Sequence, residues 1–597
     1  MRRSRSALSL CCIFLVLFLQ LPLVVSIDIP EDIRYGPFID SVVYKVIIGS
    51  GTLLALQSGV LDIGRISENY YTQTSELLEN PDIDILECPR NGYNSISINC
   101  NKYPLNITGF RRAFAFAFNK TKALNYVYEG HATLHDSVVP LTNRLCAEDL
   151  LEYHYYEADI ERGNAILDEL GFTLNSTTGF RDAPNGEPFT VIVYYSPSSS
   201  FISGTIAQLA CEALSALNVD CYVYYSWWWP WILPPSYDMV VISWTFGYDT
   251  MIWEDSLSNY RNDTFTYWTE KYYNGKTYEE VYEASTEIQK ILHYNVPRIV
   301  VCQPNYLEAI RTDQFQGHIE DHFRYFSGPW TLRRIHRVDG TYGGLFNIGL
   351  GQEPYSFNIY VTNLMYSHLI LENLYSSLYS RDPNMNPLPD LAISMLTETH
   401  SNNSMIPDGH MRYTFDILQN ASWSDGQSLT AEDISFTFLY QLESRAYGNP
   451  AGSSLNDLVA VYAPSTYRVV FEFSSESYWH FSKIAYDYII PKHIFTAIGY
   501  EGWNTWNPVF DPEEPHVTSG PFVLTDFELG EFYELTVNPL YHWLPQRQPI
   551  TPDIINTFPP VTSDPIFQIV AMTLSTTYVV VTAGIIVLLI MDRKRSE

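Results

Sequence analysis

The chain has 597 residues, of which 46% are hydrophobic and 17% charged, and its formal net charge is −32 at pH 7. So large an excess of acidic residues argues against a nucleic-acid-binding protein and against docking on anionic lipid, because like charges repel. The length is sufficient for several hydrophobic cores, so we expect two or three lobes rather than one.

The N-terminus has the pattern of a secretory signal peptide. Basic residues precede an apolar run over residues 7–25, and the small residue Ser26 follows. We therefore predict a signal peptide over residues 1–26. An uncleaved N-terminal anchor is the alternative.

The C-terminus has the pattern of a membrane anchor. Residues 566–591 contain no charged residue and are numerous enough to cross a membrane as a helix. Basic residues dominate the tail at 592–597, which places it in the cytoplasm. We therefore predict a single-pass cell-membrane protein with a large extracellular ectodomain, a linker at 546–565, a transmembrane helix and a cytoplasmic C-terminus. A buried core helix is the alternative, but such helices rarely go so long without a charge.

Strand and helix patterns alternate over the first half of the chain. The patterns predict strands at 42–48, 189–195, 221–225, 237–244 and 299–302, and helices at 53–59, 111–129, 158–170, 206–217 and 278–292. Such alternation is typical of an open α/β sheet with helices packed on it. A tryptophan-rich run at 227–231 interrupts the order, and Pro230 indicates a loop there.

A new module begins after Arg337. The patterns predict strands at 344–351, 412–417, 467–473 and 522–537, and helices at 367–375 and 431–442. The glycines of 344–351 do not make a phosphate-binding loop, because no Lys-Ser or Lys-Thr pair follows them.

Six cysteines remain after the predicted signal peptide, an even number in an oxidising location: Cys88, Cys100, Cys146, Cys211, Cys221 and Cys302. No CxxC pair or histidine-rich set accompanies them, so we expect disulfides rather than a metal site. Cys211 with Cys221 would close the simplest loop. A glycosylated exterior is consistent with the sequons at Asn106, Asn119, Asn175, Asn262, Asn402 and Asn420.

Two neighbouring stretches of the second half carry a specific resemblance. Residues 412–417 read RYTFDI and residues 423–434 read WSDGQSLTAEDI. Both resemble the signature of the family 5 extracellular solute-binding proteins, which are the peptide- and nickel-binding subunits of ABC importers. A tight turn at Asp425-Gly426 and a helix cap at Thr430 give these residues a physical role.

Further similarities extend over most of residues 36–543. They are LPDLA at 388–392, IPKHI at 490–494, SGPF at 519–522, NPLY at 538–541, RRA at 111–113, LDELGF at 167–172 and YDM at 237–239. The two halves stand in reversed order, however. The segment 27–341 resembles the C-terminal half of a family member, and the segment 342–545 resembles its N-terminal half. We expect a circular permutation, in which the strand near Val537 lies beside the segment near Tyr44. Two incomplete copies in tandem are the alternative.

The resemblance implies an α/β fold of the two-lobed periplasmic-binding-protein type (type II), with mixed sheets flanked by helices. It implies a binding protein that captures a small solute, an oligopeptide by family, in an interlobe cleft and delivers it to ABC permease subunits. No catalytic residues, metal or cofactor are implied. A surface receptor or structural binding protein without a transport role, and a binder of oligosaccharides, are alternatives.

An enzyme is a further alternative. The chain has no HExxH motif and no nucleophile elbow, and HIEDH at 318–322 lacks the spacing of a zincin. A pair of carboxylates such as Asp238 and Asp249 could serve a glycosidase, but nothing in the pattern singles it out.

By resemblance, two loops line the cleft. The first loop contains Glu353, Tyr355, Ser356, Phe357 and Asn358, and the second contains Trp244, Gly247, Tyr248 and Asp249. Trp228 is a further candidate for stacking on ligand. Peptide-binding members hold the peptide's amino terminus with an aspartate three residues after the tryptophan, where this chain has Gly247; Asp249 could substitute. The alternative is a core role for Trp244 and a solvated surface role for the carboxylates.

Overall fold

The computed structural model describes residues 29–66, 74–196, 200–225, 237–247, 257–362, 364–505 and 516–545. Within these ranges no helix has both the length and the apolar character that a membrane span requires. The predicted signal peptide and the predicted transmembrane helix at 566–591 lie outside the described residues.

The largest sheet joins strands from both halves of the chain. Its order is β21-β22-β1-β14-β2-β11-β4-β10-β8-β9, with β3 and β5 also paired to β11. The bounds are β21 Phe522–Glu528, β22 Phe532–Val537, β1 Ser41–Val46, β14 Leu345–Leu350, β2 Ile63–Ile66, β11 Arg298–Arg311, β4 Gly92–Ile98, β10 Met239–Thr245, β8 Thr190–Tyr195, β9 Asp220–Tyr225, β3 Ile83–Pro89 and β5 Ala132–Thr133. The α/β class with a mixed sheet is therefore confirmed.

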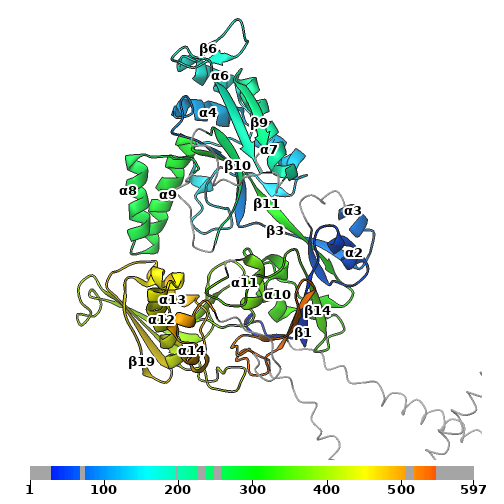
Figure 1. Ribbon diagram of the computed structural model, residues 1–597, viewed down its shortest axis with the longest axis vertical. Helices are drawn as coiled ribbons and strands as arrows, with labels where there is room; N and C mark the ends of the chain where they lie inside the picture. The colour runs from blue at the N-terminus through cyan, green and yellow to red at the C-terminus, as the bar shows by residue number, and fades with distance from the viewer. Residues whose placement is uncertain are drawn as a thin grey trace, which may run out of the picture. The chain divides into compact units, whose positions relative to one another are not determined.

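The predicted neighbourhood of Tyr44 and Val537 is also confirmed. Strand β1 pairs antiparallel with β22 and parallel with β14, and Figure 1 shows β1 and β14 side by side. The first and last described strands of the chain thus belong to one sheet and share one hydrophobic core, which includes Tyr44, Phe346 and Tyr533. Residues 27–341 and 342–545 do not form two separately closed units.

Strand β11 carries the sheet from one core to another. Its first residues pair with β4, whereas residues from Asn305 onward pair with β3 and β2. Beside β4, β8 and β10 lies a core covered by α4 (Thr108–Ala117) and α7 (Ser200–Ala216).

The first signature stretch, 412–417, lies in a separate four-stranded sheet, and the second, 423–434, leads into a helix packed on that sheet. The order of the sheet is β17-β18-β20-β19, with bounds Ala392–Thr399, Met411–Ile417, Arg468–Phe473 and Leu458–Ser465. Helix α12 (Ala431–Ser444) packs on it and begins with the predicted cap, in which Thr430 and Asp433 form a reciprocal capping box. Gly426 adopts φ +88°, as the predicted tight turn requires.

The structure corrects several expected elements. The helix expected at 111–129 is two helices, α4 and α5 (Lys120–Val127), because Asn119 starts a new helix by accepting the Lys122 N–H at 2.6 Å. The strand expected at 299–302 extends to Arg311, because the polar residues beyond 302 also pair with neighbouring strands. The helix expected at 367–375 is α11, Met365–Leu371, and the stretch 522–537 is a hairpin.

The expectation of disulfides is wrong for this structure, in which all six cysteines are free thiols. Four of the thiols instead donate to backbone carbonyl oxygens: Cys88 to Asp321, Cys100 to Ile98, Cys146 to Val139 and Cys221 to Cys211. Burial raises the pKa of Cys302 to about 12, so this thiol is protonated at neutral pH.

Candidate ligand-binding pocket

A pocket of about 370 Å³ lies where parallel strands end. Its walls include Gly49, which follows β1, and Gly351, which follows β14, together with Met365 from α11. Because β1 and β14 are parallel, the loops that follow them diverge from the same edge of the sheet. Ligands in open α/β sheets commonly bind in the crevice at this edge.

Glu308 places a carboxylate in the wall of this pocket. Its side chain is only 3% exposed, and Oε2 accepts the backbone N–H groups of Phe326 at 2.6 Å and Ser327 at 3.1 Å. Burial raises the pKa of Glu308, and those hydrogen bonds together with the Arg65 charge oppose the rise.

Two guanidinium groups share the wall with that carboxylate. Arg65 on β2 is the cross-strand partner of Glu308 on β11, and its guanidinium lies 3.7 Å from the ring centre of Tyr306. Arg324 donates from Nε to both carboxylate oxygens of Glu372, at 2.9 and 2.8 Å. The pocket thus presents charges of both signs to a bound molecule.

The turn beside Arg324 is under strain. Tyr325, which lines the pocket, adopts φ +60°, a left-handed conformation that aromatic residues rarely take. Asp321 holds the turn by accepting the backbone N–H groups of Phe323 and Arg324 at 2.8 and 2.9 Å. Burial raises the pKa of Asp321 to about 7. Strained residues that persist in a fold often mark ligand-contacting segments.

The first predicted loop lies next to this pocket in sequence, but none of its predicted residues is in the pocket wall. Glu353 accepts hydrogen bonds from the Gly530 N–H at 3.0 Å and from the Tyr533 hydroxyl. Phe357 is buried in the core with Tyr533. These contacts fix the loop to the β21–β22 hairpin.

The remaining residues of this loop divide into a buried and an exposed group. Asn358 is buried and donates from Nδ2 to the Trp503 carbonyl at 2.8 Å, while Ser356 Oγ accepts the Asn358 N–H at 3.1 Å. Tyr355 is 71% exposed. Of the predicted loop residues, Tyr355 is therefore the one whose ring is most open to a ligand.

The second predicted loop is described only up to Gly247. Trp244 is half-buried at the end of β10 opposite Tyr93, with the Arg298 guanidinium 5.6 Å from its ring centre. Its indole Nε1 is buried and has no acceptor among the described residues. The Gly247 carbonyl accepts from Asn91 Nδ2 at 3.5 Å. Tyr248, Asp249 and Trp228 lie outside the described residues.

Sequence reasoning missed the charged residues of the pocket wall, Arg65, Glu308 and Arg324. A signal was present for Glu308, because a lone carboxylate between Leu307 and Ala309 in an apolar strand is rarely buried without a purpose. No comparable signal marks Arg65, whose partner lies far away in the chain.

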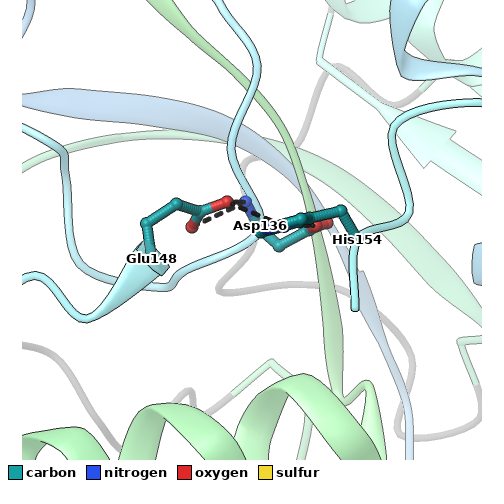
Figure 2. Close-up of side chains that lie close together, drawn as sticks. All are labelled: Asp136, Glu148 and His154. Carbon is teal, nitrogen blue, oxygen red and sulfur yellow. Dashed lines mark hydrogen bonds and ion pairs between the residues drawn. The ribbon is translucent and has the colours of Figure 1, made fainter. Parts of the chain in front are cut away.

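A cluster of Asp136, Glu148 and His154 has the residue types of a metal site, with potential ligand atoms within 4.8 Å of one another (Figure 2). The two carboxylates of the cluster already accept hydrogen bonds from other groups of the chain. Asp136 binds the Lys120 ammonium and accepts the Tyr155 N–H and His154 Nδ1, both at 3.0 Å.

Glu148 in the same cluster accepts the N–H groups of Asp136 and Ser137 at 2.9 and 2.6 Å, and the Tyr156 hydroxyl at 2.6 Å. With their lone pairs committed to N–H and O–H donors, these side chains act as a polar network that holds residues 135–156 in place.

The structure thus combines a mixed α/β sheet with a pocket at the carboxyl ends of β1 and β14. A family model described as "Bacterial extracellular solute-binding proteins, family 5 Middle" matches residues 35–261 and 387–562. Because these segments cover more than half of the chain, the protein belongs to this family of extracellular solute-binding proteins.

Two curated relatives show the level of similarity. The oligopeptide-binding protein AppA of Bacillus subtilis is 27% identical over 184 residues, which are 28% of this chain and 32% of the relative. The oligopeptide-binding protein OppA of Lactococcus lactis subsp. cremoris is 25% identical over 209 residues, 33% of this chain and 34% of the relative. The chain spans about a third of the length of these relatives. Both are described as oligopeptide-binding proteins.

Among solved structures, lactococcal OppA complexed with an endogenous peptide in the closed conformation is 17% identical. The similarity covers 48% of this chain and 57% of that chain, with a TM-score of 0.41. AppA from Bacillus subtilis in complex with a nonapeptide is 14% identical over 45% of this chain and 55% of that chain, with a TM-score of 0.39.

Proposed function

We propose that this protein is a membrane-anchored extracellular substrate-binding protein that captures a small solute between two lobes and delivers it to an ABC-type permease. The observation that carries the proposal is the 370 Å³ pocket at the carboxyl ends of β1 and β14, with Glu308, Arg65 and Arg324 in its wall. Its volume lies within the range of small-molecule sites, about 300–1,000 Å³.

The charges of the pocket favour an oligopeptide as the solute. A short peptide carries an ammonium group at one end and a carboxylate at the other. Glu308 can pair with the first, and Arg65 or Arg324 with the second, so both ends gain charge-assisted hydrogen bonds. The relatives AppA and OppA, which are described as oligopeptide-binding proteins, support the same solute class.

The predicted cleft residues extend the site beyond this pocket. Tyr355 projects into solvent from the loop after β14, and Trp244 lies near the end of β10, which is on the other side of β11 in the sheet order. In this proposal the two segments approach each other when the lobes close, with Tyr248, Asp249 and Trp228 on the same side as Trp244.

The proposal also covers the order of the two segments along the chain and the cellular location of the protein. The segment 27–341 corresponds to the second half of a typical family member and 342–545 to the first, so that the chain is a circular permutation; the pairing of β1 with β22 supports this. The apolar run at 566–591 anchors the protein, and the ectodomain lies outside the cell.

A direct binding experiment tests the proposal. Full-length protein in detergent is exposed separately to a tripeptide mixture and to an oligosaccharide mixture, and native mass spectrometry identifies what is retained. Retention of peptides, weakened at least tenfold by Glu308→Gln or Arg65→Gln, is the expected result. Retention of oligosaccharides alone, with no effect of either substitution, overturns the peptide assignment. Failure to retain any solute overturns the capture function.

A further inference from the structure

A second cavity, of about 110 Å³, lies between α10 (Pro329–Arg334) and β15 (Tyr379–Arg381). Aromatic rings form much of its wall, among them Trp330, Tyr375 and Tyr486. Glu372 also lines it and binds Arg324, which lines the first pocket, so this ion pair joins the walls of the two cavities.

Arg333 brings a buried guanidinium with unsatisfied N–H groups to this cavity. The residue is 5% exposed, and its Nε and Nη1 atoms are buried without a hydrogen-bond acceptor among the described residues. Its guanidinium lies 4.6 Å from the ring centre of Trp330 and 5.8 Å from that of Tyr541. Stacking on aromatic rings does not satisfy N–H donors, and a buried charge without an acceptor is costly.

The carboxylates of the cavity wall are occupied by other groups. Glu372 accepts the Arg324 guanidinium. Asp390 accepts the Trp543 Nε1–H at 3.1 Å and pairs with His542 Nε2 at 3.2 Å. Burial raises the pKa of Asp390, but His542 and the Arg333 charge outweigh burial and hold that pKa below its usual range. Arg333 therefore has no anionic hydrogen-bond partner within the described chain.

A second unsatisfied group lies in the same wall. The Ser380 hydroxyl oxygen is buried and has no partner among the described residues. A guanidinium and a hydroxyl that both lack partners, in one cavity, are what a bound oxyanion would satisfy.

We propose that this cavity binds the carboxylate of a small organic acid, with Arg333 and Ser380 as the donors and the aromatic rings around the apolar part of the molecule. A carboxylate fits better than a phosphate, because Asp390 and Glu372 in the wall repel a dianion. The aromatic residues of the wall, Tyr375 among them, suit an apolar or aromatic substituent. The carboxylate can come from a free acid or from the C-terminus of a short peptide.

The experiment measures binding of benzoate and of its neutral counterpart benzamide to full-length protein by calorimetry. We expect benzoate to bind at least tenfold more tightly than benzamide, because the amide lacks the charge that Arg333 requires. Arg333→Gln should weaken benzoate binding about tenfold or more, and Ser380→Ala about threefold, since charge-assisted hydrogen bonds are lost.

Two matched variants serve as controls. Arg34→Gln removes a nearby guanidinium that already pairs with Asp32 and donates to the Pro389 carbonyl at 3.1 Å, so benzoate affinity should stay unchanged. Arg65→Gln alters the first pocket alone and should also leave benzoate binding intact. Loss of benzoate binding in Arg65→Gln would place the acid in the first pocket and overturn the proposal.

Equal affinity for benzoate and benzamide, or no binding of benzoate, would also overturn the proposal of a carboxylate site. So would an unchanged affinity in a folded Arg333→Gln variant. If Arg333→Gln does not fold, the comparison of benzoate with benzamide and the effect of Ser380→Ala decide. Acetyl-dialanine and its C-terminal amide distinguish the source of the carboxylate, because binding of the acid form alone identifies a peptide terminus as a second ligand.

Discussion

Tyr44 on β1 lies directly opposite Tyr533 on β22 in an antiparallel pair. Both hydroxyl groups reach away from the pair: Tyr44 donates to the Leu369 carbonyl at 3.1 Å, and Tyr533 donates to the Glu353 carboxylate. One pair of tyrosines near opposite ends of the described chain thus positions α11 and the loop at 353–358, both of which adjoin the candidate pocket.

The contact between Tyr533 and Glu353 should be energetically coupled. Tyr533→Phe removes one donor to the carboxylate and should lower the free energy of unfolding by about 1–2 kcal/mol. In a double-mutant cycle, Glu353→Gln should cost less in the Tyr533→Phe background than in the wild type, as measured by urea denaturation. Strictly additive effects would show that the two side chains do not interact in solution.

Trp244 should contribute to ligand binding without being needed for the fold. The ring is half-buried and its indole N–H has no acceptor among the described residues, so a ligand can supply one. We expect Trp244→Ala to weaken binding of the retained solute by about 1–3 kcal/mol and ligand addition to change the fluorescence of the wild type. Circular dichroism checks the fold, and an unfolded variant would show that Trp244 is a core residue.

Glu308 should make stability depend on pH in a defined direction. Because burial raises its pKa in the folded state, the folded protein binds this proton more readily than the unfolded chain. Its contribution to stability is therefore present below the unfolded pKa of about 4.3 and is lost as pH rises through the folded value.

Glu308→Gln removes that contribution while its amide oxygen still accepts the Phe326 and Ser327 N–H groups. The variant should gain stability relative to the wild type between pH 4 and neutral pH, measured by denaturant titration. Glu169→Gln, an exposed change at the end of α6 (Ile160–Glu169), is the control and should show no such trend. A constant difference between Glu308→Gln and the wild type across this range would contradict the prediction.

His135 should make the folded protein less stable as the pH falls. It is 0% exposed, and burial together with the Lys120 charge lowers its pKa to about 3, against a weaker opposite effect of Asp136. Between pH 6.5 and about 3 the unfolded chain binds a proton that the folded protein does not, so stability falls as the pH falls. One such group contributes about 1.4 kcal/mol per pH unit.

The variant His135→Phe tests this effect. A phenyl ring preserves the edge contact with Tyr93, whose ring centre is 5.6 Å away, but cannot titrate. The acid slope of the unfolding free energy should be shallower in the variant by about one proton. An unchanged slope would mean that His135 is protonated in the folded protein.

The location of the ectodomain can be tested on intact cells. If residues 566–591 span the membrane with the C-terminus inside, protease added outside should release nearly the whole mass, because the ectodomain precedes the span. Antibodies against the ectodomain and against a C-terminal tag follow the two parts. Protection of the ectodomain in intact cells, with cleavage only after lysis, would show the opposite orientation.

The sequence by itself determined the elements whose stabilisation is local. The cap of α12 rests on Thr430 and Asp433, three residues apart, and the turn at Gly426 needs only a residue that tolerates positive φ. The family resemblance rested on the same stretches. The pairing of β1 with β22 also followed from the sequence, through the order of the resembling segments. The single helix expected across Asn119 failed because apolar spacing continues through a residue that caps a second helix.

Only the tertiary structure decided the pockets. Glu308, Arg65 and Arg324 meet because β11 pairs with β2 and the chain then turns at the strained Tyr325. Packing buries Arg333 beside Trp330, and its Nε and Nη1 atoms have no acceptor among the residues that the structure describes. Whether a charged side chain is solvated, paired or left for a ligand depends on groups distant in the chain, and local pattern carries no information about them.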